Sequence, residues 1–143
     1  MADKQKSPKL LTKEQFEKIE SVFRTHFHLG IRTTDSEGNV IEELCSKDHL
    51  PGFCRLVRRS STGDGRCISE HQRSLDLAVE TGQVYITICQ AGIVLVCVPI
   101  MDRDKALGGV FFGKCLWEPV TEVLTRDIQK RLKDIEASEL SPE

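Results

Sequence analysis

Two groups of short β-forming runs, separated by a helical insert, constrain the fold of this chain more than any other feature. The first group is a pair, residues 31–34 and 40–44, joined by a turn from Asp35 to Gly38. The second group has three runs, at residues 84–89, 93–100 and 109–117. Because short connections between successive strands allow only antiparallel pairing, the sequence predicts one five-stranded antiparallel sheet.

Helical spacing of apolar residues predicts a helix before the first strand and another after the last. Residues 13–29 begin at a capping box formed by Thr12 and Gln15, with Gly30 as the expected C-cap. Residues 120–135 follow Pro119 and carry one apolar stripe along the helix. These two segments predict helices that flank the sheet.

The insert between the two strand groups is predicted to contain two helices. Residues 50–59 form a short helix that starts near Pro51, residues 60–65 form a Ser/Gly loop, and residues 66–81 form a longer helix ended by Gly82. The order of elements is that of an α+β domain of PAS or GAF type. We therefore expect a PAS-like five-stranded antiparallel sheet with a helical insert, flanking N- and C-terminal helices, and its helices on one face.

Length and charge set limits on the organisation and partners of the chain. Its 143 residues suit one domain, which we place at residues 10–118, after a disordered tail at 1–9 and before a C-terminal helix and tail at 119–143. The formal net charge is −2, so no basic excess favours direct nucleic-acid binding. The local cluster of Arg55, Arg58 and Arg59 is interpreted as a solvated helix face.

No targeting or catalytic motif is recognised in the sequence. The polar, lysine-rich start has no apolar region behind it, and the longest apolar stretch, from Ala91 to Met101, is about half the length of a membrane span. We therefore expect a cytoplasmic protein without membrane contact. Phosphate-binding loops, H-E-x-x-H and G-x-S-x-G are absent from the sequence, so we expect no enzymatic activity.

Six cysteines lack the C-x-x-C spacing of a zinc knuckle or redox motif. A single cysteine is by default a small buried hydrophobic residue, and a reducing cytosol disfavours disulfides. Cys67 and His71, four residues apart, share a helix face that either packs in the core or ligates a metal. Metal ligation becomes the better interpretation only where several cysteine thiols converge on one site.

Two of the predicted strands carry mixed apolar and polar side chains on one face. Tyr85, Thr87 and Cys89 alternate with aliphatic residues, and Phe111, Cys115 and Trp117 share a face of the last strand. A mostly apolar wall with a few hydroxyls and thiols is typical of a small-molecule pocket. The alternative is an ordinary core with a few polar atoms, and these residues do not separate the two.

Spaced motifs over residues 12–118 resemble the PocR sensory domain family. They are Phe53-Cys-Arg-Leu56, Arg66-Cys67, Thr81-Gly82, Cys89-Gln-Ala-Gly92, Pro99-Ile100, Leu107-Gly108 and Gly113. The chain departs from the family pattern at Gln90, where His is frequent, and no output domain is recognised within these 143 residues. We therefore expect either a stand-alone sensor or part of a larger regulator.

The resemblance implies a variant PAS-like fold that senses a short alcohol, diol or related hydrocarbon derivative, in signal transduction or transcription control. The family's three cysteines correspond to Cys54, Cys67 and Cys89, and Cys115 is a candidate fourth. The alternative hypothesis is a metal, iron–sulfur or redox sensor, because three or four thiolates suit zinc or an iron–sulfur cluster. The expected ligand-binding residues are Cys54, Cys67, Cys89, Tyr85, Thr87, Phe111, Cys115 and Trp117.

The apolar stripe of the last helix must be buried somewhere, because short helices are marginal in water without packing. We predict that the terminal helices pair with those of a second copy to form a homodimer, and that a ligand shifts the relative angle of these helices. The alternative is that the stripe folds back onto its own domain and the protein is a monomer. A partner signalling protein or an output domain would receive the signal.

Overall fold

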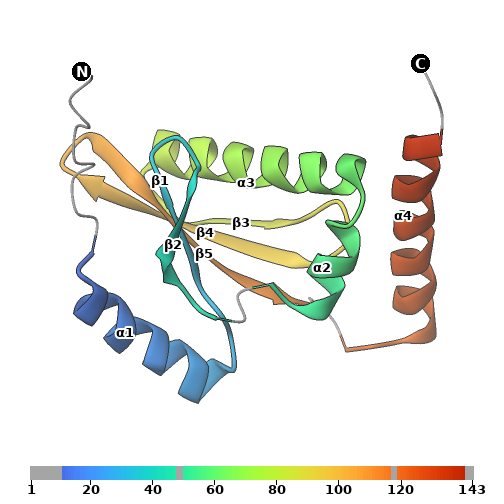
Figure 1. Ribbon diagram of the computed structural model, residues 1–143, viewed down its shortest axis with the longest axis horizontal. Helices are drawn as coiled ribbons and strands as arrows, with labels where there is room; N and C mark the ends of the chain where they lie inside the picture. Colours follow the sequence, from blue (N-terminus) through green and yellow to red (C-terminus); the bar gives the residue numbers. More distant parts are fainter. Residues whose placement is uncertain (1–10, 48–49, 117–118, 141–143) are drawn as a thin grey trace.

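The computed structural model describes residues 11–47, 50–116 and 119–140 of the chain. It contains one five-stranded antiparallel sheet in the order β2-β1-β5-β4-β3 (Figure 1). The strands are β1 (Arg32–Asp35), β2 (Val40–Cys45), β3 (Tyr85–Ile88), β4 (Val94–Asp102) and β5 (Lys105–Cys115). The helices are α1 (Lys13–Val22), the π-helix η1 (Phe23–Phe27), α2 (Gly52–Val57), α3 (Ser61–Thr81) and α4 (Glu122–Leu140). The predicted fold class is confirmed.

The first helix begins as predicted and ends differently. Both hydrogen bonds of the capping box are present, between Thr12 and Gln15, at 3.0 and 3.1 Å. The α-helix then widens into η1, and His28 takes the left-handed conformation at φ 54° that was expected of Gly30. Histidine is among the residues that tolerate this conformation, so the helix ends two residues earlier than predicted.

Residues 60–65, predicted as a loop, are the start of α3, and that prediction was wrong. Ser60 is the N-cap, and its hydroxyl accepts a hydrogen bond of 2.9 Å from the amide of Gly63. A Cβ atom on Gly63 would lie 2.1 Å from the carbonyl oxygen of Val57, so only glycine allows α2 and α3 to approach this closely. The glycine therefore serves packing between the helices rather than a loop.

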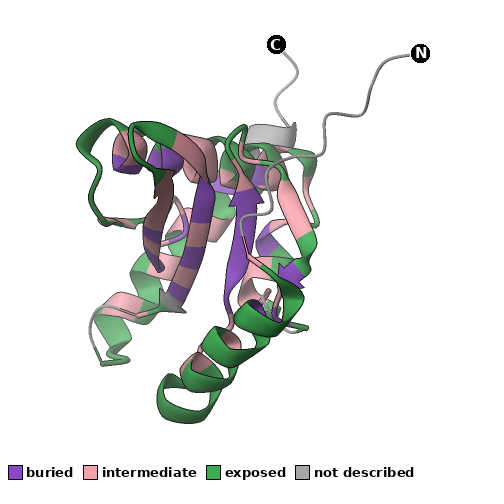
Figure 2. Ribbon diagram, turned by 90° about the vertical axis from the view of Figure 1, so that its left-hand side faces the viewer, coloured by how far each residue is buried: buried purple, intermediate pink, exposed green. Residues whose placement is uncertain are grey.

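Helices cover both faces of the sheet, not one face as the sequence suggested. On the α3 face lies a cluster with at most 3% exposure, formed by Leu75, Ala78, Leu95, Cys97 and Phe111. On the opposite face, Phe16 of α1 packs with Ile31 and Leu44. Because side chains alternate along a strand, Phe111 faces α3 while Val110 and Phe112 face α1. Figure 2 shows the buried residues concentrated on the strands between these helices.

The hairpin between β4 and β5 is tighter than predicted. Only Arg103 and Asp104 form its turn, and β5 starts at Lys105 instead of residue 109. Arg103 takes φ 56°, which allows the reversal within two residues. Asp102 and Lys105 consequently pair across the ladder.

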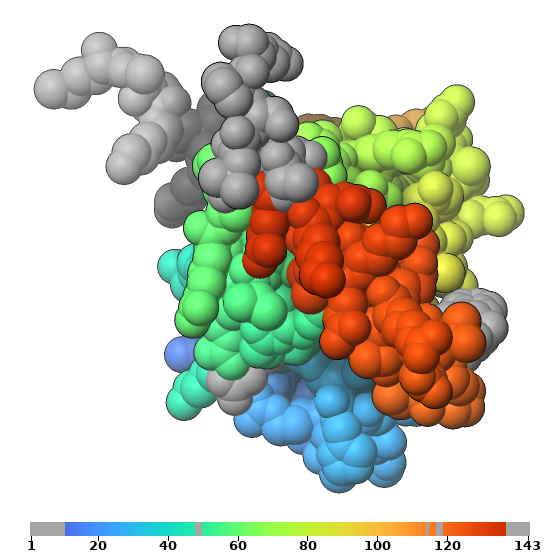
Figure 3. Space-filling model, turned by 90° about the vertical axis from the view of Figure 1, so that its right-hand side faces the viewer, coloured from blue at the N-terminus to red at the C-terminus, as the bar shows by residue number. Residues whose placement is uncertain are grey.

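The terminal helix α4 packs on its own chain through its second half. Ile135 is only 4% exposed and forms a cluster with Val57 of α2 and Ala91. Figure 3 shows α4, in orange and red, beside the green surface of α2 and the start of α3. Val120 and Val123, ahead of and within the first turn, remain 74% and 77% exposed. No helix in the described part of the chain is long and apolar enough to cross a bilayer.

Candidate functional site

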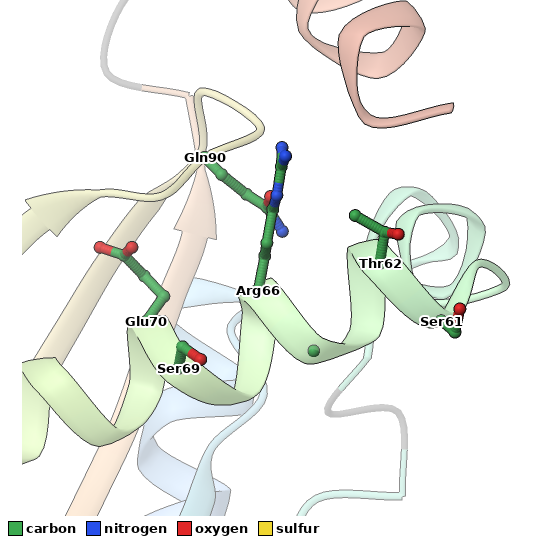
Figure 4. A pocket seen from close by; sticks show the side chains of 7 residues that line it. Ser61, Thr62, Arg66, Ser69, Glu70 and Gln90 are labelled. Atoms are coloured by element: carbon green, nitrogen blue, oxygen red, sulfur yellow. The ribbon is translucent and has the colours of Figure 1, made fainter. Parts of the chain in front are cut away.

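A hollow of about 510 Å³ lies over the first half of α3 (Figure 4). Its lining residues are polar or small and come from α3 and from the turn after β3. They are Ser61, Thr62, Gly65, Arg66, Ser69, Glu70 and Gln90. Three hydroxyls, an amide, a guanidinium and a carboxylate around one space suit a small polar molecule.

Gln90 ties the β3–β4 turn to α3 at the base of this hollow. Its Nε2 donates to the carbonyl oxygen of Gly63 at 3.1 Å and to Sγ of Cys67 at 3.5 Å. Its Oε1 is buried and has no hydrogen-bond partner among the described residues. A buried amide oxygen in that state is costly, so a hydroxyl that reached it would gain a hydrogen bond.

The same turn also contacts α4. Nη1 of Arg131 donates to the backbone carbonyl of Gln90 at 3.4 Å. A Cβ atom on Gly92 would lie 3.6 Å from Ile128 and Arg131, which places these two α4 side chains directly over the turn. The turn after β3 and the terminal helix are therefore in direct contact.

Two of the four predicted cysteine ligands pack on one cluster. Cys67 and Cys89 pack on the same cluster of Val57, Ala91 and Ile135, while Cys54 is half-buried on α2 and Cys115 is exposed at the end of β5. Burial raises the pKa of the Cys89 thiol, which keeps it protonated. Among the described residues, no group of three or more histidine, cysteine, aspartate or glutamate side chains is placed to hold a metal ion.

The Cys67–His71 pair is joined through the backbone. Nδ1 of His71 lies 2.7 Å from the carbonyl oxygen of Cys67, so this nitrogen carries the proton. The ring centroid of His71 lies 4.9 Å from that of Phe111. Both side chains are half-buried and pack against core residues, and metal ligation by the pair stays a prediction.

The predicted pocket wall lies under α3 rather than at the hollow. Phe111 has no exposed surface, and Tyr85 packs against the same cluster. Thr87 is half-buried on β3, and Trp117 lies outside the described residues. Of the eight predicted binding residues, those that the structure describes do not line the hollow. Their role in ligand binding stays a prediction.

Two functional candidates were missed from the sequence. Arg58 was assigned to a solvated helix face, yet its side chain is only 16% exposed, whereas Arg55 and Arg59 are exposed. Arg32, 7% exposed, is the one charged residue in an otherwise uncharged run at residues 31–34. A charged residue inside a short buried strand is the signal that would have found it.

These features define an α+β domain of PAS-like architecture, in which the inserted helices carry a polar hollow connected to the terminal helix. The family model described as the sensory domain found in PocR matches residues 9–141. The chain therefore belongs to this family, as its spaced motifs indicated. Membership in a family of sensory domains indicates small-molecule sensing and points to a non-catalytic role.

The chain is also similar to a solved structure. The crystal structure of the GAF domain/HD domain protein from Geobacter sulfurreducens aligns with a TM-score of 0.44 at 12% sequence identity, covering 90% of this chain and 93% of that chain. No curated protein matches this chain.

Proposed function

We propose that this domain senses a short alcohol, diol or related hydrocarbon derivative, bound in the hollow over α3, and passes the signal to a transcription-control or signalling partner through α4. One observation carries the proposal. Gln90 lines the hollow with its side chain and accepts a hydrogen bond from Arg131 of α4 on its backbone carbonyl. One residue thus contacts both the ligand space and the C-terminal helix α4.

The chemistry of the lining supports a small polar ligand. Ser61, Thr62 and Ser69 offer hydroxyls, and Gln90 offers a buried amide oxygen. A diol of about five heavy atoms gains at most about 1.5 kcal/mol per atom, so its affinity is micromolar at best. Such weak binding suits a sensor for a compound that accumulates to millimolar levels.

Binding at the hollow is expected to act on α4 through the turn. A ligand hydroxyl that bonds the Oε1 of Gln90 competes with the packing that holds this side chain against Gly63 and Cys67. The backbone of the turn then shifts relative to Arg131. Because a ligand shifts an equilibrium only by binding two states differently, the bound state must favour one position of α4.

Hydrogen exchange of residues 122–136, with and without propane-1,2-diol, tests the proposal. We expect the diol to change exchange in α4, and Gln90→Ala to weaken both binding and this change. Arg131→Met should keep binding and lose the change in α4, because it cuts only the link to the helix. Gln83→Ala is the matched control, since Gln83 is an exposed glutamine away from the hollow. Unchanged exchange in α4 at saturating diol, or equal effects of Gln90→Ala and Gln83→Ala, would contradict the proposal.

The alternative of a cysteine-ligated metal, iron–sulfur or redox sensor stays a prediction. Cys67 and Cys89 pack on one cluster, but two thiols fall short of the three or four protein ligands that zinc sites use. Metal analysis and the absorption spectrum of protein purified without oxygen test this alternative directly.

A further inference from the structure

Arg32 is a charged side chain in the interior of the domain. It opens β1 and lies opposite Cys45 of β2 and Phe111 of β5. Cross-strand partners point to the same face of a sheet, so Arg32 lies on the face that α3 covers, as Phe111 does. Only 7% of the residue is exposed, and its Nε and Nη1 are buried without a hydrogen-bond partner among the described residues.

Arg58 brings a second cation to the same region. It caps the end of α2, and its guanidinium forms an ion pair of 3.5 Å with Asp64 in the first turn of α3. Its Nη2 is nevertheless buried without a hydrogen-bond partner in the described part of the chain. Burial lowers the pKa of Arg32, and the positive charge of Arg58 lowers it further. The two guanidinium groups therefore share one region between the insert and the sheet.

The groups that offset the charge of Arg32 are weak ones. Cys45, Glu42 and Cys67 act in the opposite direction from Arg58. Two of these are thiols, and Glu42 is exposed to solvent, where water screens its charge. Among the ion pairs between described residues, none includes Arg32. Arg32 is buried without an ion-pair partner among the described residues, Arg58 has only the distant Asp64, and three of their nitrogen donors are orphaned, so a further anion would complete them.

We propose that Arg32 and Arg58 form a binding site for a small molecule that carries a carboxylate. Two guanidinium charges and the one carboxylate of Asp64 leave a single positive charge, which a monoanion balances. A carboxylate has two oxygens and about four acceptor positions, enough for the three orphaned donors, and charge-assisted bonds of this kind are among the strongest in proteins. The inference goes beyond the proposed function: neither arginine lines the hollow, so this is a second site on the sensor and it takes a different class of small molecule.

Matched pairs of compounds test the inference. The two members of a pair share a carbon skeleton, and one carries a carboxylate where the other carries an alcohol. The pairs are acetate and ethanol, lactate and propane-1,2-diol, and succinate and butane-1,4-diol. Each compound is added to the full chain at about 10 mM and thermal unfolding is recorded, because a ligand of the folded state raises the midpoint. The lactate affinity is then measured by calorimetry, with inorganic phosphate as the competing anion.

Three variants identify the site. Arg32→Met removes one buried charge and keeps the length of the side chain, and Arg58→Met removes the other. Arg55→Met is the matched control, since Arg55 lies on α2 three residues before Arg58 and is exposed. Far-UV circular dichroism establishes that each variant folds, and if one of the two buried-site variants does not, the other decides. We expect lactate affinity to fall by about tenfold or more in both buried-site variants and to stay unchanged in Arg55→Met.

The outcomes separate this inference from the proposed function. Stabilisation by the alcohols alone would overturn the carboxylate site and leave the sensor intact. Equal losses in Arg32→Met and Arg55→Met, or phosphate that displaces lactate with equal affinity, would reduce the effect to general anion binding and also overturn it. No response to any compound would overturn both proposals.

Discussion

Replacing Ile135 by alanine tests whether α4 belongs to the folded unit of its own chain. Ile135 is 4% exposed and packs against Val57 and Ala91. The change removes three carbon atoms, worth about 0.8 kcal/mol each in transfer free energy, and a cavity contribution brings the loss to about 3 kcal/mol. Alanine returns about 0.4 kcal/mol through its higher helix propensity. We therefore expect the free energy of unfolding to fall by about 2–3 kcal/mol.

The assay is thermal and urea unfolding followed by circular dichroism. At about 3 °C per kcal/mol for a chain of this size, the midpoint should fall by about 6–9 °C. Val123→Ala is the matched control, because Val123 lies on the same helix and is 77% exposed. It should change the free energy of unfolding by no more than about 0.5 kcal/mol. Equal effects of the two substitutions would show that α4 does not pack on the domain through Ile135, and the coupling through the Gln90 turn would fail with it.

Three further predictions concern packing, titration and assembly. Gly63→Ala should destabilise the domain, since its Cβ would lie 2.1 Å from the carbonyl oxygen of Val57. Gly65→Ala, whose Cβ meets nothing within 4 Å, should instead stabilise α3 by up to about 1 kcal/mol, and urea unfolding of the two variants measures the difference. Burial raises the pKa of Cys97 from 9.0 to about 12, so the folded chain keeps a proton that the unfolded chain releases, and stability should fall as the pH rises from 9.0 toward 12. Unfolding curves of Cys97→Ala should show a weaker dependence, and the part that remains includes the contribution of Cys89, whose pKa is also raised. Light scattering should give a dimer that Val120→Asp with Val123→Asp dissociates, and a monomeric wild-type chain at tens of micromolar would contradict the predicted homodimer.

Several helix ends and hairpins could be predicted from local sequence patterns because interactions between nearby residues determine them. The Thr12 capping box, the β1–β2 hairpin and the Gly82 C-cap each depend on residues close to one another along the chain. The mistaken loop at 60–65 shows the limit of that reasoning. Ser60 and Gly63 carry the composition of a loop, but their use depends on how closely α2 approaches, and that distance is a tertiary property.

The site was harder to predict because its residues meet only after folding. Nothing local distinguishes Arg58, only 16% exposed, from Arg55, which is exposed on the preceding turn of α2. The alternation of the strands correctly put Tyr85 and Phe111 on one face, but that pattern is shared by a pocket wall and by a core under a helix. Only the position of α3 decides whether this face of the sheet is a pocket wall or part of the core.

The first turn of α3 connects the two proposed binding regions. Asp64 forms an ion pair with Arg58, and its neighbours Gly63 and Gly65 belong to the hollow, one through its hydrogen bond from Gln90 and the other through the lining. A carboxylate on Nη2 of Arg58 shares this guanidinium with Asp64, which pairs with Nη1 and is exposed enough to exchange that partner partly for water. A weaker ion pair would loosen the turn that holds Gln90. Binding at the buried arginines must then change the affinity of the hollow, and by thermodynamic linkage a ligand in the hollow changes carboxylate affinity by the same factor.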